Sequence, residues 1–159
     1  MKHSTKTIIF KGLSVLPSQL GYSLYHFLQN IGGNNKLEYK MESAKNTFKT
    51  VVGILDKNNI KLAHKNIAEL GSGWVPIFPY QLITEGKVKK VDTYDVNEHF
   101  SQKEIEQLNA FYANQFDCVF EKKGKYNLLK GVSYFPKTTI CEGEIQNIDL
   151  VLSRFVLEH

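Results

Sequence analysis

The residues best suited to chemistry lie in one short segment, ELGSG, which runs from Glu69 to Gly73. Glu69 ends an apolar run, and two glycines, Gly71 and Gly73, follow it. Glycine allows a tight turn and a close approach of the backbone to a ligand, because it has no Cβ atom. A second acid, Asp95, stands 26 residues after Glu69 (95 − 69 = 26) in the segment VDTYDVN. Together the two segments predict a binding site for a small ligand.

The elements that must position these residues alternate along the chain. Strand-like and helix-like segments follow one another at lengths that are typical of a parallel sheet covered by helices. We therefore predict an α/β fold, with a Rossmann-like, doubly wound, mostly parallel sheet and helices on both faces. The predicted strands are 65–70, 89–96, 131–136 and 148–155, and the predicted helices between them are 74–86 and 101–116.

Local signals indicate where the two helices begin. Pro76 and Pro79 suit the first turn of a helix that starts near Trp74, because the first backbone N–H groups of a helix have no partner within it. Ser101 and Glu104 have the spacing of a capping box at the start of the other helix.

The first part of the chain has a different pattern. Apolar residues at helical spacing predict helices at 18–31 and 42–57, and Asn58 and Asn59 mark the exit from the second. We interpret residues 1–62 as an N-terminal helical cover and residues 63–159 as a partial Rossmann-like core, the two forming one domain overall.

The position of the glycines and of Asp95 narrows the choice of ligand. In an open parallel sheet, ligands bind beyond the carboxyl ends of the strands, where an acid such as Asp95 can accept both hydroxyls of a ribose. A dinucleotide fingerprint would need a third glycine where this chain has Pro76. Glu69 would also repel a pyrophosphate and instead suits the amino end of a cationic ligand.

Three motifs in order carry a resemblance to a known family. The segments ELGSG, VDTYDVN and IDLVLSRFVLEH resemble the class I S-adenosylmethionine-dependent methyltransferases. The likeness is strongest to the small-molecule branch, in which the first motif reads E-x-G-x-G and the fourth strand reads fD-l-v-x-S-x-x-v-L-E-H. The resemblance covers roughly residues 66–159. It implies S-adenosylmethionine as cofactor and methyl transfer to a small molecule or a glycan precursor.

The resemblance also implies roles for particular residues. The methionine and ribose parts of the cofactor would lie along the first motif, the ribose hydroxyls and adenine beside the second, and the reactive end beside the fourth strand. The residues concerned are Glu69, Gly71, Ser72 and Gly73 in the first motif, Asp95 and Val96 in the second, and Ser153 and Arg154 in the fourth strand.

The chain departs from the family pattern in three places. Val75 stands where the family often has a third glycine, and no acid stands near Thr138 or Thr139, where the family usually binds the adenine amino group. The motifs reach only the fourth of the family's seven strands. Either the sequence is a piece of a longer enzyme, or a second copy or another protein covers the open edge of the sheet.

Catalytic groups are less clearly marked. His99 and His159 follow the second and fourth predicted strands, and Arg154 could hold a carboxylate through its guanidinium. For the two histidines the sequence favours a structural or solvent-exposed role, and for Arg154 it leaves a surface salt bridge equally open.

Composition excludes several classes of protein. The net charge is +4, but almost all the basic residues are lysines and Arg154 is the only arginine, which argues against a reader of nucleic-acid bases. The lysine-rich segment 121–131 is expected to be an exposed turn. No apolar run is long enough to span a membrane. Cys118 and Cys141 form no metal-binding or disulfide pattern, so we predict no metal site and a cytoplasmic location.

Two other functions remain open. The first is a binding or scaffold domain that keeps a nucleotide cleft without catalysis. The second is a nicotinamide-dependent dehydrogenase, which Glu69 and Pro76 argue against.

Overall fold

The computed structural model describes residues 37–138 and 146–153. By its internal contacts the chain divides into Met1–Lys40 and Met41–His159. Apart from residues 37–40, the first unit lies outside the described residues, and so does the helix predicted at 18–31. The proposed boundary between residues 62 and 63 stays a prediction.

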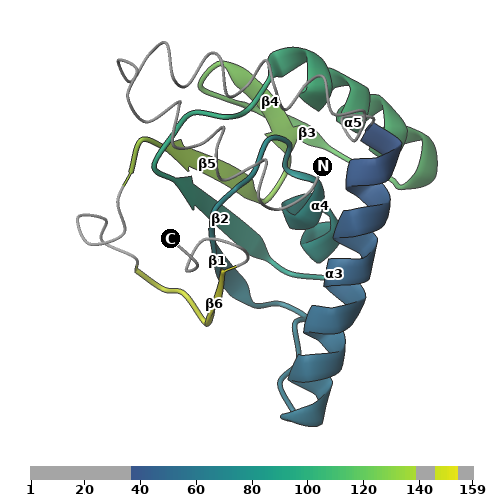
Figure 1. Cartoon of the computed structure of the whole chain (residues 1–159), viewed down its shortest axis with the longest axis vertical. Helices are drawn as coiled ribbons and strands as arrows, with labels where there is room; N and C mark the ends of the chain where they lie inside the picture. The colour runs from purple at the N-terminus through teal and green to yellow at the C-terminus, as the bar shows by residue number, and fades with distance from the viewer. Residues whose placement is uncertain (1–36, 139–145, 154–159) are drawn as a thin grey trace, which may run out of the picture. The chain divides into compact units, whose positions relative to one another are not determined.

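A parallel sheet of four strands forms the centre of the second unit (Figure 1). The strands lie in the order β5-β2-β1-β6, and every neighbouring pair is parallel. The α/β class, the parallel sheet and the four strands predicted from the sequence are therefore confirmed. The strands are β1 Asn66–Leu70, β2 Lys90–Asp95, β5 Val132–Pro136 and β6 Leu150–Ser153.

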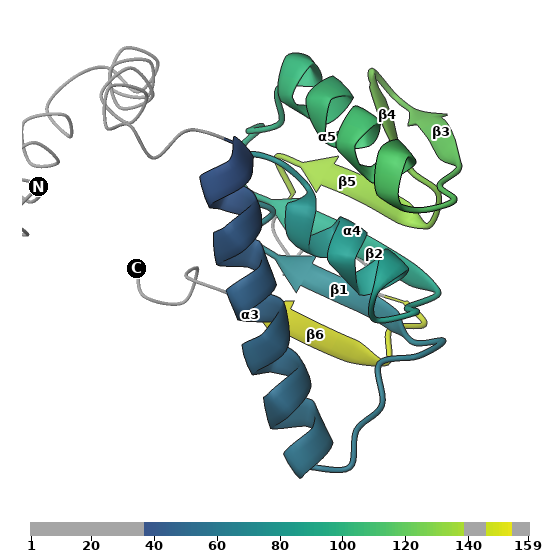
Figure 2. The same ribbon diagram turned by 90° about the vertical axis from the view of Figure 1, so that its right-hand side faces the viewer.

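Three helices within residues 37–138 lie on one face of this sheet, and not on both faces as expected (Figure 2). They are α3 Leu37–Lys57, α4 Ile77–Thr84 and α5 Gln102–Gln115. The reason is the winding of the chain. The steps from β1 to β2 and from β2 to β5 advance in the same direction across the sheet, so right-handed crossovers place α4 and α5 on the same face.

The core lies between these helices and the sheet. Its centre is apolar, and the α3 side chains Phe48, Val51 and Val52 pack against it. The helical stripe predicted for α3 thus faces the sheet, which explains why a helix with an otherwise polar surface forms here. The buried residues of this cluster are Leu55, Leu62, Ile67, Phe78, Leu82, Val88 and Val91.

The helix boundaries differ from the predicted ones by a few residues. Helix α3 already includes Leu37, the first described residue, and so extends further toward the N-terminus than the predicted start at Glu42. Helix α4 starts at Ile77 because Pro76, with φ −76° and ψ 45°, is not helical and forms the N-cap. Ser101 is the N-cap of α5, as predicted, but its side chain makes no capping hydrogen bond.

A two-stranded antiparallel hairpin between α5 and β5 was not predicted. Strands β3 Phe120–Lys123 and β4 Tyr126–Leu129 pair across Gly124, whose φ is +60°. The segment does contain an exposed turn, at Gly124 and Lys125, but it is not exposed as a whole, because Tyr126, Leu128 and Leu129 are buried. The lysines that suggested a solvated turn lie mostly on β3 and around the turn, whereas β4 packs against α5.

Candidate functional site

The glycine segment forms a tight turn directly after β1. Gly71 and Gly73 have φ values of +84° and +63°, in the left-handed region that favours glycine. The Gly71 N–H donates to the carbonyl of Tyr94 at 2.9 Å, which ties the turn to the end of β2. A Cβ atom added to Gly73 would meet nothing within 4 Å, so the backbone there borders open space. A tight turn with an accessible backbone is what the sequence predicted at this point.

Asp95, at the end of β2, accepts hydrogen bonds from this turn. Its Oδ2 accepts hydrogen bonds from the backbone N–H and the hydroxyl of Ser72, both at 3.1 Å. Its Oδ1 accepts from the backbone N–H of Asn97 at 3.0 Å. The ends of β1 and β2 thus meet at one carboxylate, as expected for adjacent parallel strands.

His99 also lies beside Asp95, and we call the residues around Asp95 the Asp95 cluster. Its Nε2 lies 3.4 Å from Asp95 Oδ1, and its backbone N–H donates to the Tyr134 hydroxyl at 2.9 Å. The Tyr134 hydroxyl in turn donates to the carbonyl of Asn97 at 3.2 Å. The ring of Trp74 lies against the imidazole, with 5.4 Å between ring centroids. His99, a candidate catalytic residue, therefore contacts the predicted ribose-binding acid.

The electrostatics of the cluster favour a charged carboxylate. Burial of Asp95 acts to raise its pKa, but the hydrogen bonds from His99, Asn97 and Ser72 outweigh burial, and the pKa lies below its ordinary value. Burial raises the pKa of the Tyr134 hydroxyl, which stays neutral as a hydrogen-bonding group.

Glu69 lies deeper, within β1. Its side chain is buried, and the hydroxyl of Thr93, its register partner on β2, donates to Glu69 Oε2 at 2.6 Å. Glu69 and Asp95 are on the same face of the sheet, since Thr93 and Asp95 are two residues apart on one strand. Two carboxylates therefore lie on the helix-covered face, at the ends of neighbouring strands.

The other predicted site residues fall into three groups. Val96 follows β2 and is 63% exposed, and Ser153, the last described residue of β6, pairs with Leu70 of β1. Thr138, near the expected position of an adenine-binding acid, donates its backbone N–H to the carbonyl of Asp95 at 3.1 Å. Arg154, His159 and Thr139 lie outside the described residues.

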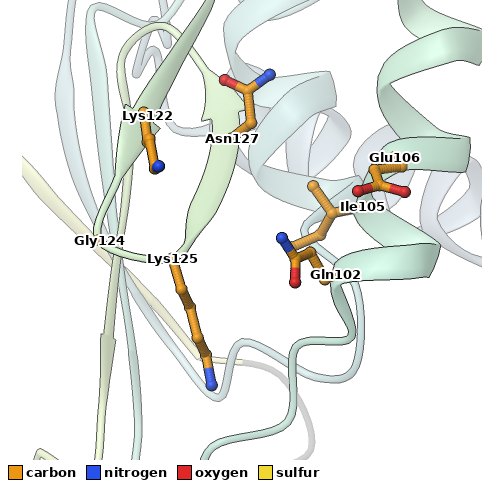
Figure 3. Close-up of a pocket in the computed structure, with 7 residues that line it drawn as sticks. All are labelled: Gln102, Ile105, Glu106, Lys122, Gly124, Lys125 and Asn127. Atoms are coloured by element: carbon orange, nitrogen blue, oxygen red, sulfur yellow. The ribbon is translucent and has the colours of Figure 1, made fainter.

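A groove opens between α5 and the β3–β4 hairpin (Figure 3). Its volume is about 690 Å³, and none of the cofactor-binding or catalytic residues predicted from the sequence lines it. Lys125, at its rim, forms an ion pair with Glu98 at 2.6 Å, which lowers the pKa of Glu98. The lining residues are Gln102, Ile105 and Glu106 of α5 and Lys122, Gly124, Lys125 and Asn127 of the hairpin.

Several members of the cluster were not predicted from the sequence. Thr93 could have been found, because the period of a strand places it on the same face as Asp95. Trp74 and Tyr134 carried no such signal. They join the cluster only because the turn after β1 and strand β5 lie on either side of the end of β2.

Comparisons with protein-family models, with curated proteins and with solved structures found no match to this chain. Among the described residues, no helix is long and apolar enough to cross a membrane. The case for a function therefore depends on the arrangement of the residues around Asp95.

Proposed function

We propose that this chain is an S-adenosylmethionine-dependent methyltransferase that binds its cofactor at the carboxyl ends of β1 and β2 and acts on a small molecule or a glycan precursor. The observation that carries the proposal is the contact between the glycine turn and Asp95, in which the Ser72 N–H donates to Asp95 Oδ2 at 3.1 Å. A glycine turn after the first strand and an acid at the end of the next form a site for a ribose.

The chemistry of the side chains present fits this cofactor. Asp95 supplies a charged acceptor for ribose hydroxyls, and the exposed Val96 beside it offers an apolar surface to a flat base. The buried carboxyl group of Glu69, which accepts a hydrogen bond from the Thr93 hydroxyl, offers acceptor oxygens below the glycine turn, and these suit a ligand with an amino group. The open space beside Gly73 leaves room for a ligand to approach the protein backbone.

The same features speak against a dinucleotide. A pyrophosphate would be placed beside the glycine turn, next to the carboxyl group of Glu69, and an acid at that position would oppose its binding. Pro76, the N-cap of α4, takes the place of the third glycine of a dinucleotide fingerprint.

In this proposal the chain promotes methyl transfer mainly by positioning the cofactor. The cofactor would supply the methyl group from its sulfonium, and the glycine turn and Asp95 would fix the nucleoside. Orientation of two reactants accounts for much of the rate in such a transfer. Asp95 and Glu69 serve to bind and orient, and neither is required to move a proton.

Calorimetric titration with S-adenosylhomocysteine tests the proposal. We expect one-to-one binding by the unaltered chain and loss of binding in Asp95→Ala. Asp56→Ala is the matched control, since it removes an exposed acid that pairs with Lys61 at 3.4 Å and lies at the end of α3, before β1, whereas the glycine turn follows β1. Circular dichroism of each variant checks that the fold survives, because Asp95 also anchors Ser72.

The outcomes separate the three functions. Binding that disappears only in Asp95→Ala supports the methyltransferase site. Preferred binding of NADH would instead indicate a dehydrogenase. A folded chain that binds both ligands weakly or not at all would refute the proposal and favour the binding or scaffold domain without catalysis.

A further inference from the structure

The segment that follows β2 holds one wall of the proposed site, and side chains hold its backbone in place. It connects β2, which ends at Asp95, to α5, which begins at Gln102. The backbone N–H of Asn97 donates to Asp95 Oδ1 at 3.0 Å. Val96 stands between these two residues and is 63% exposed, so few contacts of its own side chain fix its position. The place of Val96 therefore depends on how Asp95 and Asn97 are held.

The hydroxyl of Tyr134, on the neighbouring strand β5, holds this segment from the other side. It donates to the carbonyl of Asn97 at 3.2 Å and accepts the backbone N–H of His99 at 2.9 Å. Asn97 is thus bound through its N–H to Asp95 and through its carbonyl to Tyr134. One hydroxyl therefore reaches the carboxylate of Asp95 through a single intervening residue.

The ring of Tyr134 is held in place by contacts that do not involve its hydroxyl. It stacks on the ring of Phe100 with 3.8 Å between centroids, and the ring of Tyr126 lies 5.8 Å away. Strand β5 is paired with β2, where Tyr134 has Thr93 as its register partner. Tyr134→Phe keeps all of these contacts and removes only the two hydrogen bonds.

We propose that Tyr134 is a positioning residue of this site, whose hydroxyl fixes the segment Val96–His99 so that Asp95 and Val96 together face the nucleoside of the ligand. This inference rests on the proposed function, because it assumes that a nucleoside binds at the end of β2. Tyr134 itself does not touch the ligand. It acts through Asn97, which lies between its hydroxyl and the carboxylate of Asp95.

Loss of the hydroxyl should affect the ligand more than the fold. The hydrogen bond to Asn97 is exposed to solvent, and the one from His99 is partly buried. Water can therefore replace the hydroxyl at both backbone groups, and the free energy of unfolding should change little. Water does not fix the segment in one position, so Asp95 and Val96 lose the arrangement that the nucleoside needs.

The experiment compares affinity with stability in the same variant. S-adenosylhomocysteine is titrated by calorimetry into the unaltered chain and into Tyr134→Phe, and both are unfolded with urea. We expect Tyr134→Phe to bind about fivefold to tenfold more weakly, the loss that corresponds to about one hydrogen bond. Its urea midpoint should stay close to that of the unaltered chain.

Tyr80→Phe is the matched control. The hydroxyl of Tyr80 also makes two hydrogen bonds, to Asn109 Oδ1 at 2.7 Å and from the backbone N–H of Leu129 at 3.0 Å, and neither partner belongs to the segment after β2. We expect the opposite result for this variant, a lower urea midpoint and an unchanged affinity of the folded chain.

Hydrogen exchange supplies a readout that does not need the ligand. The N–H groups of Asn97 and His99 should exchange faster in Tyr134→Phe than in the unaltered chain, because the segment opens more often. The N–H of Val91, which donates to the carbonyl of Gly131 at 2.8 Å within the sheet, should exchange at the same rate in both.

The possible results distinguish this inference from the proposed function. If the unaltered chain and Tyr134→Phe bind the ligand equally well, the positioning role is refuted and the cofactor site remains. If Tyr134→Phe loses as much stability as Tyr80→Phe, or does not fold, Tyr134 is a structural residue and the inference is again refuted. If the unaltered chain is folded and binds no ligand, the proposed function fails and the positioning role fails with it.

Discussion

The hydroxyl of Tyr80 offers the sharpest test of how this fold is held together. Tyr80 is on α4, and its side chain is fully buried. Its hydroxyl donates to Asn109 Oδ1 of α5 at 2.7 Å and accepts the backbone N–H of Leu129 of β4 at 3.0 Å. One hydroxyl therefore joins α4, α5 and the unpredicted hairpin.

We expect Tyr80→Phe to destabilise the protein by about 2 kcal/mol. The ring stays, so no cavity opens, but the buried N–H of Leu129 loses its acceptor, and an unsatisfied buried donor costs about 1–3 kcal/mol. For a chain of this length, a loss of about 2 kcal/mol corresponds to a decrease in Tm of about 4–8 °C. Urea unfolding followed by circular dichroism measures the change in the free energy of unfolding.

Tyr112→Phe is the matched control. Tyr112 is also buried, and its ring packs edge-to-face on Tyr80 at 5.2 Å. Within the described residues, no hydrogen bond is found for its hydroxyl. We expect this variant to change the stability by less than about 0.5 kcal/mol. If Tyr80→Phe and Tyr112→Phe lose the same stability, the reasoning about the Leu129 N–H is wrong.

Two further predictions concern stability. Gly53→Ala should stabilise the protein by about 0.5–1 kcal/mol, because Gly53 is inside α3 and an added Cβ would have nothing within 4 Å. Gly131→Ala should instead destabilise the protein by about 1–3 kcal/mol, because Gly131 has φ +94° and an added Cβ would lie 3.1 Å from a backbone oxygen. Thermal unfolding of both variants checks the pair, and equal signs would contradict it. Since the folded pKa of Asp95 is below its ordinary 3.8, its carboxylate stabilises the fold above about pH 4, and that contribution is lost as the pH falls through the lowered value. Asp95→Asn should therefore be less stable than the unaltered chain at neutral pH, and the difference in urea midpoint should shrink in acid; a constant difference would refute this.

The strands and the glycine turn were predictable because their signals are local. An apolar strand followed by Gly71 and Gly73 shows where the chain must leave the sheet, and Asp95 at the end of the next strand then falls at the same edge. Periodicity also indicated which face of α3 is buried. These features depend on neighbours within a few residues along the chain.

The β3–β4 hairpin was missed for a physical reason. Its first strand is charged and half exposed. Its second strand is buried against α5, and the N–H of Leu129 in that strand donates to the hydroxyl of Tyr80, which is 49 residues away in the sequence. Each strand alone is too short to show a clear alternation. The burial that makes β4 a strand depends on contacts between distant segments, which a reading of local pattern does not include.

The sequence by itself determined the class of the fold, the positions of its four parallel strands and the edge at which two glycines and two acids gather. Only the tertiary structure decided the partners of those acids. Asp95 binds Ser72 and His99, and Glu69 binds Thr93, because the strand register and the path of the turn place these side chains within hydrogen-bond distance. Alternation along a strand sets the face on which a side chain lies. Its partner across the sheet is set by register and by loop conformation, which depend on how the whole domain packs.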